Sequence, residues 1–405
     1  MSYTIAAITN EWDIFMRRYR SLFTELIKFE DIDHIFFIES PLTLYSFIRF
    51  VMGRMNRRDK ERWQRVLKKG IISREGNIFI ITPVVPFPFL SIRPLLKLNR
   101  FCLNRFQLYV IGYLKRKLKV KDMILWINHP YFSAEIAGSV KSDLFCYDLC
   151  DDYNTKEKDD SGVFAKEVRN NDLYLTEHAD IMFVSSKKLF EDRYPFNPNI
   201  YRVPNGVHAD LLRGNGEPAD EPRDLKQISR PRLVYIGNIS TTIDLELLRL
   251  IDRIHPEWSV IMVGPVHGTE VKRALRAIDC VHLPGVRSFE ESIAYLKCSD
   301  VAIIPYVVSP WAISADSLKI YNFIASGKPV VSTGIGGVEN FQGIISIGRD
   351  REDFVQKVSL ALSEKKDDRQ KRETAQYSII KKHTWQERAE RIHSLMFERL
   401  RGSVK

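Results

Sequence analysis

Short apolar runs alternate with amphipathic segments along the chain, a pattern typical of α/β proteins with parallel sheets. Residues 300–306, DVAIIPY, form an apolar run, as expected of a strand buried on both faces. Helical spacing follows over residues 317–326, and Gly327 and Pro329 are helix stop signals. The segment 300–331 therefore predicts a strand, a polar loop, a helix and a second strand.

Other strands of the C-terminal half end in turns rich in glycine and proline. The apolar run 233–236 is followed by Gly237 and Asn238, the run 258–263 by Gly264, and the run 281–283 by Pro284 and Gly285. Repeated βα units with such turns predict a doubly wound domain of the mononucleotide-binding type. The chain has no GxGxxG motif, which disfavours a dinucleotide ligand.

A phosphate group is expected beside Lys319. Ligands of open α/β sheets bind at the carboxyl ends of the strands, where the loop 307–317 and the following helix begin. A helix start offers unpaired N–H groups and the positive end of the helix dipole, and Lys319 adds a full charge there. The alternative is that Lys319 is an ordinary exposed lysine.

Several motifs together resemble those of one enzyme family. They are Gly237-Asn238-Ile239, Leu283-Pro284-Gly285-Val286, the DVAIIPY strand, ADSLKIYNF at 315–323, GKPVV at 327–331 and HTWQERAERI at 383–392. On these motifs the chain resembles the GT-B glycosyltransferases, which have two Rossmann-like, doubly wound domains facing a central cleft. It is most similar to bacterial polysaccharide transferases of the teichuronic-acid and xanthan glucuronosyltransferase type. The resemblance implies a UDP-sugar donor, with glucuronic acid as one candidate sugar.

The same resemblance implies a set of donor-binding residues. Lys319 would meet the nucleotide diphosphate, and backbone groups of residues 284–287 would hold the base. The full donor set is Gly237, Asn238, Pro284, Gly285, Val286, Arg287, Tyr306, Ser317, Lys319 and Asn322. The chain departs from the large retaining branch, which carries two glutamates where this sequence has Ser314 and Asn322. Asn322 can still hydrogen-bond a ribose hydroxyl, but the departure favours an inverting enzyme.

The N-terminal half is expected to supply the acceptor site and a general base. In DLFCYDLCDDY, residues 143–153, a predicted strand over 144–147 is followed by three acids. Clustered carboxylates raise one another's pKa, which suits a base. The resemblance implies an aspartate at this point after the same strand, and we therefore place the catalytic base at Asp151, with Asp152 second. Asp148 is expected to support structure. Helix capping or plain solvation is the alternative reading of these acids.

Other polar residues follow predicted strands of this half. His129 is an alternative base, although a histidine beside a proline is more often structural. We also expect His129 to contact the acceptor, together with Trp12, Arg17 and Arg18. The arginines equally fit an exposed helix face.

Positive charge is concentrated in one segment. Residues 49–121 hold 19 Lys and Arg against 3 acids, whereas the whole chain has 61 against 51. Apolar and aromatic residues are interleaved with these cations, which suits an anionic membrane surface. Prolines and charges interrupt every apolar run before it could span a bilayer. The aromatic and apolar character makes nucleic acid an unlikely partner.

The length predicts two domains. They are an acceptor-binding domain over 1–203 with the membrane-facing segment 49–121, and a nucleotide-sugar domain over 204–384. The resemblance also implies that residues 385–405 form a helix that crosses back to the first domain. The five cysteines lack metal-ligand spacing, and the N-terminus lacks signal-peptide features, so a cytoplasmic location at the inner membrane face is expected. No metal and no cofactor are expected.

The sequence thus predicts a metal-independent glycosyltransferase that moves a sugar from a UDP-sugar to a lipid-linked saccharide in cell-surface polysaccharide synthesis. Two alternatives stay open. One is a sugar-nucleotide epimerase or phosphorylase on the same fold, and the other is a non-catalytic scaffold in capsule assembly.

Overall fold

The computed structural model describes residues 2–12, 18–55, 57–87, 93–131, 134–153, 163–208 and 220–402. The chain divides into two compact units. Unit 1 comprises residues 1–185, 189–203 and 388–405, and unit 2 comprises residues 186–188 and 204–387. No helix in the described ranges is both long enough and apolar enough to cross a membrane.

Unit 1 is built on a sheet whose described strands run in the order β10-β9-β8-β7-β1-β2-β5-β4. Neighbours pair in parallel except β4 and β5, which are antiparallel. The strands are β1 (Tyr3–Ile8), β2 (Ile32–Ile38), β4 (Ile72–Glu75), β5 (Ile78–Ile81), β7 (Asp122–Ile127), β8 (Leu144–Leu149), β9 (Ile181–Val184) and β10 (Ile200–Arg202). A short parallel pair, β3 (Leu42–Thr43) with β6 (Val84–Val85), lies beyond the ends of β2 and β5.

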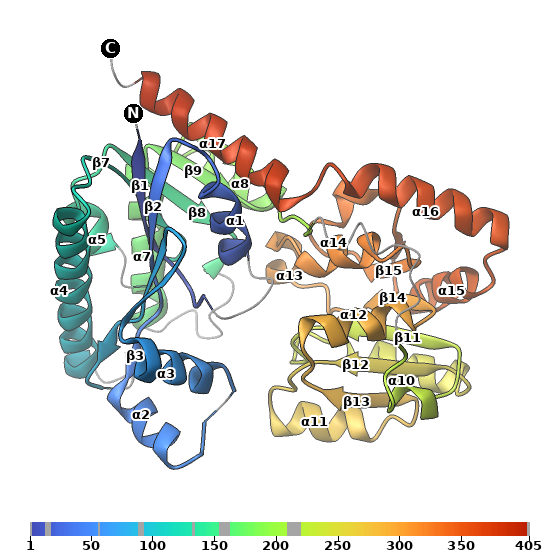
Figure 1. Cartoon of the computed structure of the whole chain (residues 1–405). Coiled ribbons are helices and arrows are strands. Elements are labelled where there is room, and N and C mark those ends of the chain that lie inside the picture. Colours follow the sequence, from blue (N-terminus) through green and yellow to red (C-terminus); the bar gives the residue numbers. More distant parts are fainter. Residues whose placement is uncertain are drawn as a thin grey trace. The chain divides into compact units, whose positions relative to one another are not determined.

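Helices cover both faces of this sheet, so its strands are apolar on both sides (Figure 1). In β1, Ile5 and Ala7 belong to one core and Ala6 and Ile8 to the other. The first core includes α1 (Arg18–Leu26) and the end of α17 (Trp385–Gly402). The second includes α4 (Arg93–Lys117), α5 (Ala134–Ser139), α7 (Val163–His178) and α8 (Lys187–Arg193). Helices α2 (Leu44–Val51) and α3 (Arg57–Lys69) connect β3 to β4.

Unit 2 contains a parallel sheet whose described strands run in the order β13-β12-β11-β14-β15-β16. The strands are β11 (Arg232–Ile236), β12 (Ser259–Val263), β13 (Val281–Gly285), β14 (Val301–Ile304), β15 (Val330–Thr333) and β16 (Ser346–Gly348). The helices are α10 (Leu245–Ile254), α11 (Thr269–Arg276), α12 (Phe289–Lys297), α13 (Pro310–Ser314), α14 (Leu318–Ala325), α15 (Arg351–Leu362) and α16 (Lys366–Ile380). Two short 3₁₀ helices span Leu225–Gln227 and Val338–Phe341.

Local signals fix the helix ends of unit 2 near their predicted places. The carboxylate of Asp244 accepts a hydrogen bond from the N–H of Leu247 and caps α10. Gly327 follows α14 with a φ of +73°, a conformation that glycine adopts without steric cost. In unit 1, β8 runs two residues further than the predicted strand, so Asp148 lies inside the strand and not after it.

Candidate functional site

The carboxyl edge of the unit 2 sheet is formed by main chain at three adjacent strands. Gly237, Gly264 and Gly285 end β11, β12 and β13, and their φ angles are +145°, +142° and +84°. The N–H of Gly237 donates to Val263 O at 2.9 Å, and the N–H of Gly264 donates to Gly285 O at 2.9 Å. A Cβ on Gly264 would lie 2.0 Å from the Gly237 carbonyl oxygen. The strands thus present backbone where a ligand can approach closely.

Lys319 lies over this backbone edge. It is in the first turn of α14, and its Nζ donates to the Tyr306 hydroxyl at 2.8 Å. The same nitrogen is 5.2 Å from the Tyr306 ring centroid and 5.4 Å from that of Tyr235. A Cβ on Gly237 would lie 2.3 Å from Lys319 Cε and 2.9 Å from Nζ, so only glycine leaves room for this lysine. No carboxylate in the described part of the chain forms an ion pair with Lys319.

The tyrosines form a directed hydrogen-bond chain behind Lys319. The Tyr235 hydroxyl donates to Asn238 O at 2.7 Å, and the two tyrosine hydroxyls are 3.1 Å apart. Because Tyr235 uses its single proton on that carbonyl, Tyr306 donates to Tyr235 and accepts from Lys319. Burial alone would raise the pKa of Tyr306, but the adjoining Lys319 ammonium lowers it below its usual value. These hydrogen bonds of Tyr235 and Tyr306 therefore orient Lys319 and keep it at the end of β11.

The remaining residues of the predicted donor set, and Ser314, lie around α14. Ser317 is the N-cap residue of α14, and its side chain makes no capping hydrogen bond. The Oδ1 atom of Asn322 is buried and has no hydrogen-bond partner among the described residues. Ser314 is 1% exposed, and its hydroxyl donates to Trp311 O at 2.9 Å. An unpartnered buried acceptor is costly, so Asn322 Oδ1 is suited to receive a ligand hydroxyl.

Asp316 positions this region, and the sequence reasoning did not single it out. Its carboxylate accepts from the Tyr321 hydroxyl at 2.9 and 3.1 Å and from the N–H of Asn205 at 2.6 Å. A Cβ on Gly337 would lie 2.6 Å from Asp316 Oδ1. The carboxylate thus fixes the turn before Ser317 from three sides. An acid immediately before a helix N-cap was the only signal available in the sequence.

The side chain of Arg287 is directed into its own unit. Its guanidinium pairs with Asp224 at 2.8 Å and donates to the Tyr295 hydroxyl at 3.3 Å. The neighbouring Val286 is 52% exposed, and Gly285 has an open side, where no atom would lie within 4 Å of an added Cβ. Residues 284–287 therefore offer main chain and the Val286 side chain to a ligand, while Arg287 is held by an acid.

At the carboxyl edge of the unit 1 sheet, Trp12 and Arg18 differ from expectation. Trp12 is 2% exposed, its N–H donates to Glu39 at 2.6 Å, and its ring packs on Phe37. Arg18 is 5% exposed, and its guanidinium pairs with both oxygens of Asp148 at 3.0 and 3.1 Å. The expectation of acceptor contact is corrected for both side chains because each is buried and engaged internally. Arg18 is likewise not on an exposed helix face.

The remaining predicted acceptor arginine, Arg17, lies outside the described residues. Buried acids dominate the rest of this edge. Glu39 is 1% exposed and contacts Arg62, at 3.7 Å, and Arg65. Asp148 is fully buried, as the partner of Arg18. These acids are therefore neutralised within unit 1.

The candidate bases follow β8 and β7. Asp151 is partly exposed, whereas Asp152 is 6% exposed with Arg193 at 3.8 Å. His129 is 8% exposed, and burial lowers its pKa from 6.5 to about 4, so its imidazole is neutral at pH 7. Among these three residues, Asp151 is the most accessible to a substrate. No cluster of three or more metal-ligating side chains occurs in the described ranges.

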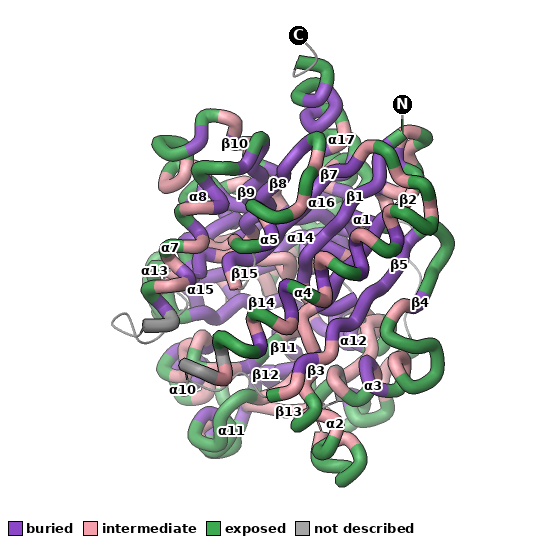
Figure 2. The backbone as a smooth tube through the Cα atoms, turned by 90° about the vertical axis from the view of Figure 1, so that its left-hand side faces the viewer, coloured by how far each residue is buried: buried purple, intermediate pink, exposed green. Residues whose placement is uncertain are grey.

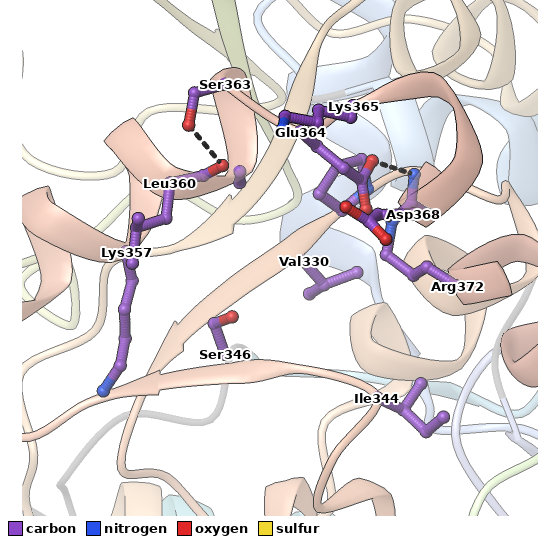
Figure 3. A pocket seen from close by; sticks show the side chains of 12 residues that line it. Val330, Ile344, Ser346, Lys357, Leu360, Ser363, Glu364, Lys365, Asp368 and Arg372 are labelled. Carbon is purple, nitrogen blue, oxygen red and sulfur yellow. Dashed lines mark hydrogen bonds and ion pairs between the residues drawn. The ribbon is translucent and has the colours of Figure 1, made fainter. Parts of the chain in front are cut away.

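A hollow in unit 2 lies at the opposite end of its sheet and does not belong to this site (Figure 3). Its volume is about 420 Å³, and Val330 and Ser346, which line it, stand at the beginnings of β15 and β16. Arg372 and Glu364, which both line it, pair with each other at 2.8 Å. Ligands of parallel sheets bind at the carboxyl ends instead.

Part of unit 2 matches a known protein family. Residues 230–364 match the family described as "Glycosyl transferases group 1". A stretch of 234 residues is 26% identical to "Putative teichuronic acid biosynthesis glycosyltransferase TuaH" of Bacillus subtilis (strain 168). That match spans 54% of this chain and 57% of the relative.

Solved structures match over nearly the whole chain. One is described as "Trehalose-6-phosphate from E. coli bound with UDP-2-fluoro glucose", with a TM-score of 0.69, 12% identity and coverage of 97% of this chain and 99% of that one. Another is a sucrose-phosphate synthase from Thermosynechococcus elongatus, with a TM-score of 0.67, 13% identity and coverage of 99% and 100%. At these identities the likeness shows the fold. The predicted fold class, GT-B with two doubly wound units, is confirmed.

Proposed function

We propose that this chain, whose residues 230–364 form a glycosyl transferases group 1 domain on a GT-B fold, moves a sugar from a UDP-sugar to a lipid-linked saccharide. The product would serve cell-surface polysaccharide synthesis, and glucuronic acid is a candidate sugar. The observation that carries the proposal is the placement of Lys319. Its ammonium lies over the glycine at the end of β11 and pairs with no acid of the described residues.

This placement suits a nucleotide diphosphate. A cation without a carboxylate partner, beside open main chain and a helix start, attracts an anion without first breaking an ion pair. Departure of UDP leaves negative charge on the diphosphate, which Lys319 and the first N–H groups of α14 would stabilise. These groups supply the charge that a bound metal would otherwise supply, so the proposed reaction is metal-independent. Asn322 Oδ1 would accept a hydrogen bond from a ribose hydroxyl.

The transfer step needs a base in unit 1. As an acceptor hydroxyl oxygen forms its bond to the anomeric carbon, the bond from that carbon to the diphosphate oxygen breaks, and the hydroxyl proton passes to the base. We assign this role to Asp151, with Asp152 second. His129 is the alternative, because its neutral imidazole can accept a proton. We propose inversion at the anomeric carbon, since Ser314 and Asn322 stand where the retaining branch carries glutamates.

The acceptor is proposed to be held at a membrane surface. The cation-rich segment 49–121 includes α3 and α4, and α4 carries aromatic rings beside its cations. Arg105 lies 5.5 Å from the Phe101 ring centroid, and Lys117 lies 5.6 Å from that of Tyr113. Aromatic and cationic side chains together favour the headgroup region of an anionic bilayer. We therefore propose peripheral attachment at the inner face of the cell membrane.

Calorimetric titration with UDP, GDP, dTDP and a panel of UDP-sugars tests the donor site. UDP is expected to bind, and Lys319→Ala should weaken it by roughly ten- to a hundredfold because a charged hydrogen bond is lost. Lys272→Ala is the matched control, because Lys272 also lies in the first turn of a unit 2 helix but is exposed. No nucleotide binding by the unchanged protein would reject the donor site and favour a non-catalytic scaffold.

Asp151→Asn tests the base. This variant should bind UDP as the unchanged protein does and lose transfer to the acceptor. Normal turnover would reject the assignment and move the test to Asp152→Asn and His129→Gln. Consumption of a UDP-sugar by the unchanged protein without any acceptor would instead indicate an epimerase or phosphorylase.

A further inference from the structure

Helix α2 in unit 1 has its apolar side on the outside. Five large apolar residues of α2 and the residue after it are more than half exposed: Leu44, Tyr45, Ile48, Val51 and Met52, at 52%, 51%, 55%, 70% and 55%. Their spacing is that of one helical face, which in a globular protein normally contacts the core. No residue of α2 is buried (Figure 2). The helix therefore presents to solvent the kind of face that other helices of this unit bury.

The opposite side of α2 is firmly attached. Thr43 and Ser46 form a capping box that fixes the helix start. The Trp63 indole N–H donates to the Ser46 hydroxyl at 2.9 Å, and the Phe47 and Trp63 ring centroids are 4.9 Å apart. These contacts tie α2 to α3 and set which face is free. The exposed stripe is thus a built feature, because the fold orients it.

Positive charge surrounds the stripe. Residues 44–71 contain nine Lys and Arg against two acids. Arg62 and Arg65 face inward to Glu39. Among the cations of this segment whose burial is described, Arg49, Arg54, Lys60, Lys68 and Lys69 are exposed. Apolar side chains ringed by cations match the boundary between acyl chains and anionic headgroups. The same charge would repel a second copy of this helix, so a symmetric dimer through α2 is disfavoured.

The stripe also lies at the end of the sheet where an acceptor is expected. Helix α2 begins six residues after β2 ends, and the intervening β3 pairs with β6 beyond the carboxyl end of β5. His129 and Asp151 follow the carboxyl ends of β7 and β8 in the same parallel sheet. A membrane that contacts α2 therefore lies on the side of unit 1 that carries the candidate bases.

We propose that α2 is the membrane-inserting element of this protein: its outer stripe enters the interface of an anionic bilayer, while the cations of α2 and α3 contact the headgroups. In the role assigned to unit 1 above, this insertion brings the lipid-linked acceptor to the carboxyl edge of the sheet. That second role rests on the proposed function, whereas the insertion itself rests on the exposed stripe. The apolar run of α4 differs, because Val110, Ile111 and Leu114 are buried in the core.

Quenching by brominated acyl chains tests insertion directly. Val51→Trp, with Val51 in the stripe, should lose at least about half of its added fluorescence in phosphatidylglycerol vesicles with brominated chains, since a residue of an interfacial helix reaches the acyl boundary. Leu360→Trp is the control, because Leu360 is 63% exposed on α15 of unit 2. Equal signals for both variants, in a protein that binds the vesicles, would overturn the proposal.

Vesicle flotation tests what the stripe contributes. Ile48→Gln/Val51→Gln should weaken binding to vesicles containing phosphatidylglycerol at least about tenfold, because two apolar side chains no longer leave water. Leu360→Gln should bind as the unchanged protein does. Equal binding by the double variant would overturn insertion, as would absence of vesicle binding combined with lipid-independent dimers that this variant abolishes.

UDP titration of the same variants separates the two proposals. The double variant should bind UDP normally, which shows that unit 2 is intact, and should unfold in denaturant at the same midpoint as the unchanged protein, which shows that unit 1 is folded. Vesicle insertion by a protein that binds no nucleotide would support the membrane role of α2 and reject the proposed transferase. UDP binding by a protein that does not insert into vesicles would support the nucleotide site and reject the membrane role of α2.

Discussion

The carboxyl edges of the two sheets use charge in opposite ways. In unit 2, Lys319 contacts tyrosine rings and a hydroxyl, and no acid of the described residues pairs with it. In unit 1, buried Glu39 and Asp148 are neutralised by arginines, as Arg18 neutralises Asp148 at 3.0 Å. The unit 2 edge therefore has a lysine without an acidic partner among the described residues, as the proposed binding of a diphosphate requires. Much of the charge at the unit 1 edge maintains the fold.

The difference teaches that charged residues after a strand do not by themselves mark a site. A buried ion pair serves stability and cannot readily bind a ligand, because removing one partner leaves the other charge unsolvated. A cation held by neutral groups is available to a ligand at little cost. Substitutions at the two edges should therefore separate into effects on stability and effects on binding.

The largest effect is expected for Asp148→Ala. It leaves the buried Arg18 guanidinium without its partner, and the free energy of unfolding should fall by about 3–5 kcal/mol in denaturant titration. The double change Arg18→Met/Asp148→Leu should recover much of this loss, since neither charge remains. Lys319→Ala should change stability by less than about 0.5 kcal/mol. A loss below about 1 kcal/mol for Asp148→Ala would mean that the pair is not a structural support.

The next effect concerns pH and His129. The unfolded chain takes up this proton near pH 6.5, but the folded protein takes it up only near pH 4, because burial lowers the pKa. Unfolding is therefore favoured as pH falls from about 6.5 to about 4, where His129 costs the native state roughly 3 kcal/mol relative to neutral pH. His129→Gln should flatten the measured stability-against-pH curve in that window. An unchanged slope would show that His129 titrates normally in the native state.

Gly237→Ala tests whether the glycine at the end of β11 is needed to leave room for Lys319. Its Cβ would overlap Lys319, so UDP affinity should fall about tenfold, beside a strain cost of about 1–3 kcal/mol in stability. Gly343→Ala provides the control, because Gly343 also has a positive φ, +78°, but has no atom within 4 Å of a Cβ. Calorimetry should find weakened UDP binding for Gly237→Ala alone. Equal affinities would remove the argument that this glycine admits the lysine.

The smallest effect is expected for Tyr306→Phe. The change removes the hydroxyl that accepts from Lys319, and a net hydrogen bond of this kind contributes about 0.5–1.5 kcal/mol, or a few-fold in the Kd for UDP. Tyr377→Phe, on the exposed side of α16, should leave the Kd unchanged. Tighter binding by Tyr306→Phe would show instead that Tyr306 holds Lys319 away from the ligand.

The fold, and the glycine turns that end the strands of unit 2, could be predicted from the sequence because their signals are local. Apolar runs that end at a glycine, such as the one before Gly237, indicate both a buried parallel strand and the turn at its end. The partners of Arg18 could not be read, because Asp148 is 130 residues away and ion pairing leaves no periodic trace. Tyr235 and Tyr306 are likewise joined only by the order of strands in the sheet.

Helix α2 shows another limit of sequence reasoning. Its apolar stripe predicts a buried face as well as it predicts an exposed one, because periodicity defines a face and not its surroundings. The predicted membrane segment covers residues 49–121 and so leaves out the first residues of α2. It includes α4, although Val110, Ile111 and Leu114 of that helix pack into the core. The two cases are distinguished only by the contact of Phe47 in α2 with Trp63 in α3, which leaves the apolar stripe of α2 exposed.

The last helix has a consequence for how this protein is made. Ala389, Ile392 and Met396 of α17 are fully buried in the core of unit 1, together with residues of β1 and α1. Domains generally fold as they leave the ribosome, N-terminal ones first. Here a nascent chain that has emerged through unit 2 still lacks these core side chains, so its first unit stays incomplete until residues near 396 appear. Along this chain, unit 1 therefore starts before unit 2 and is completed after it.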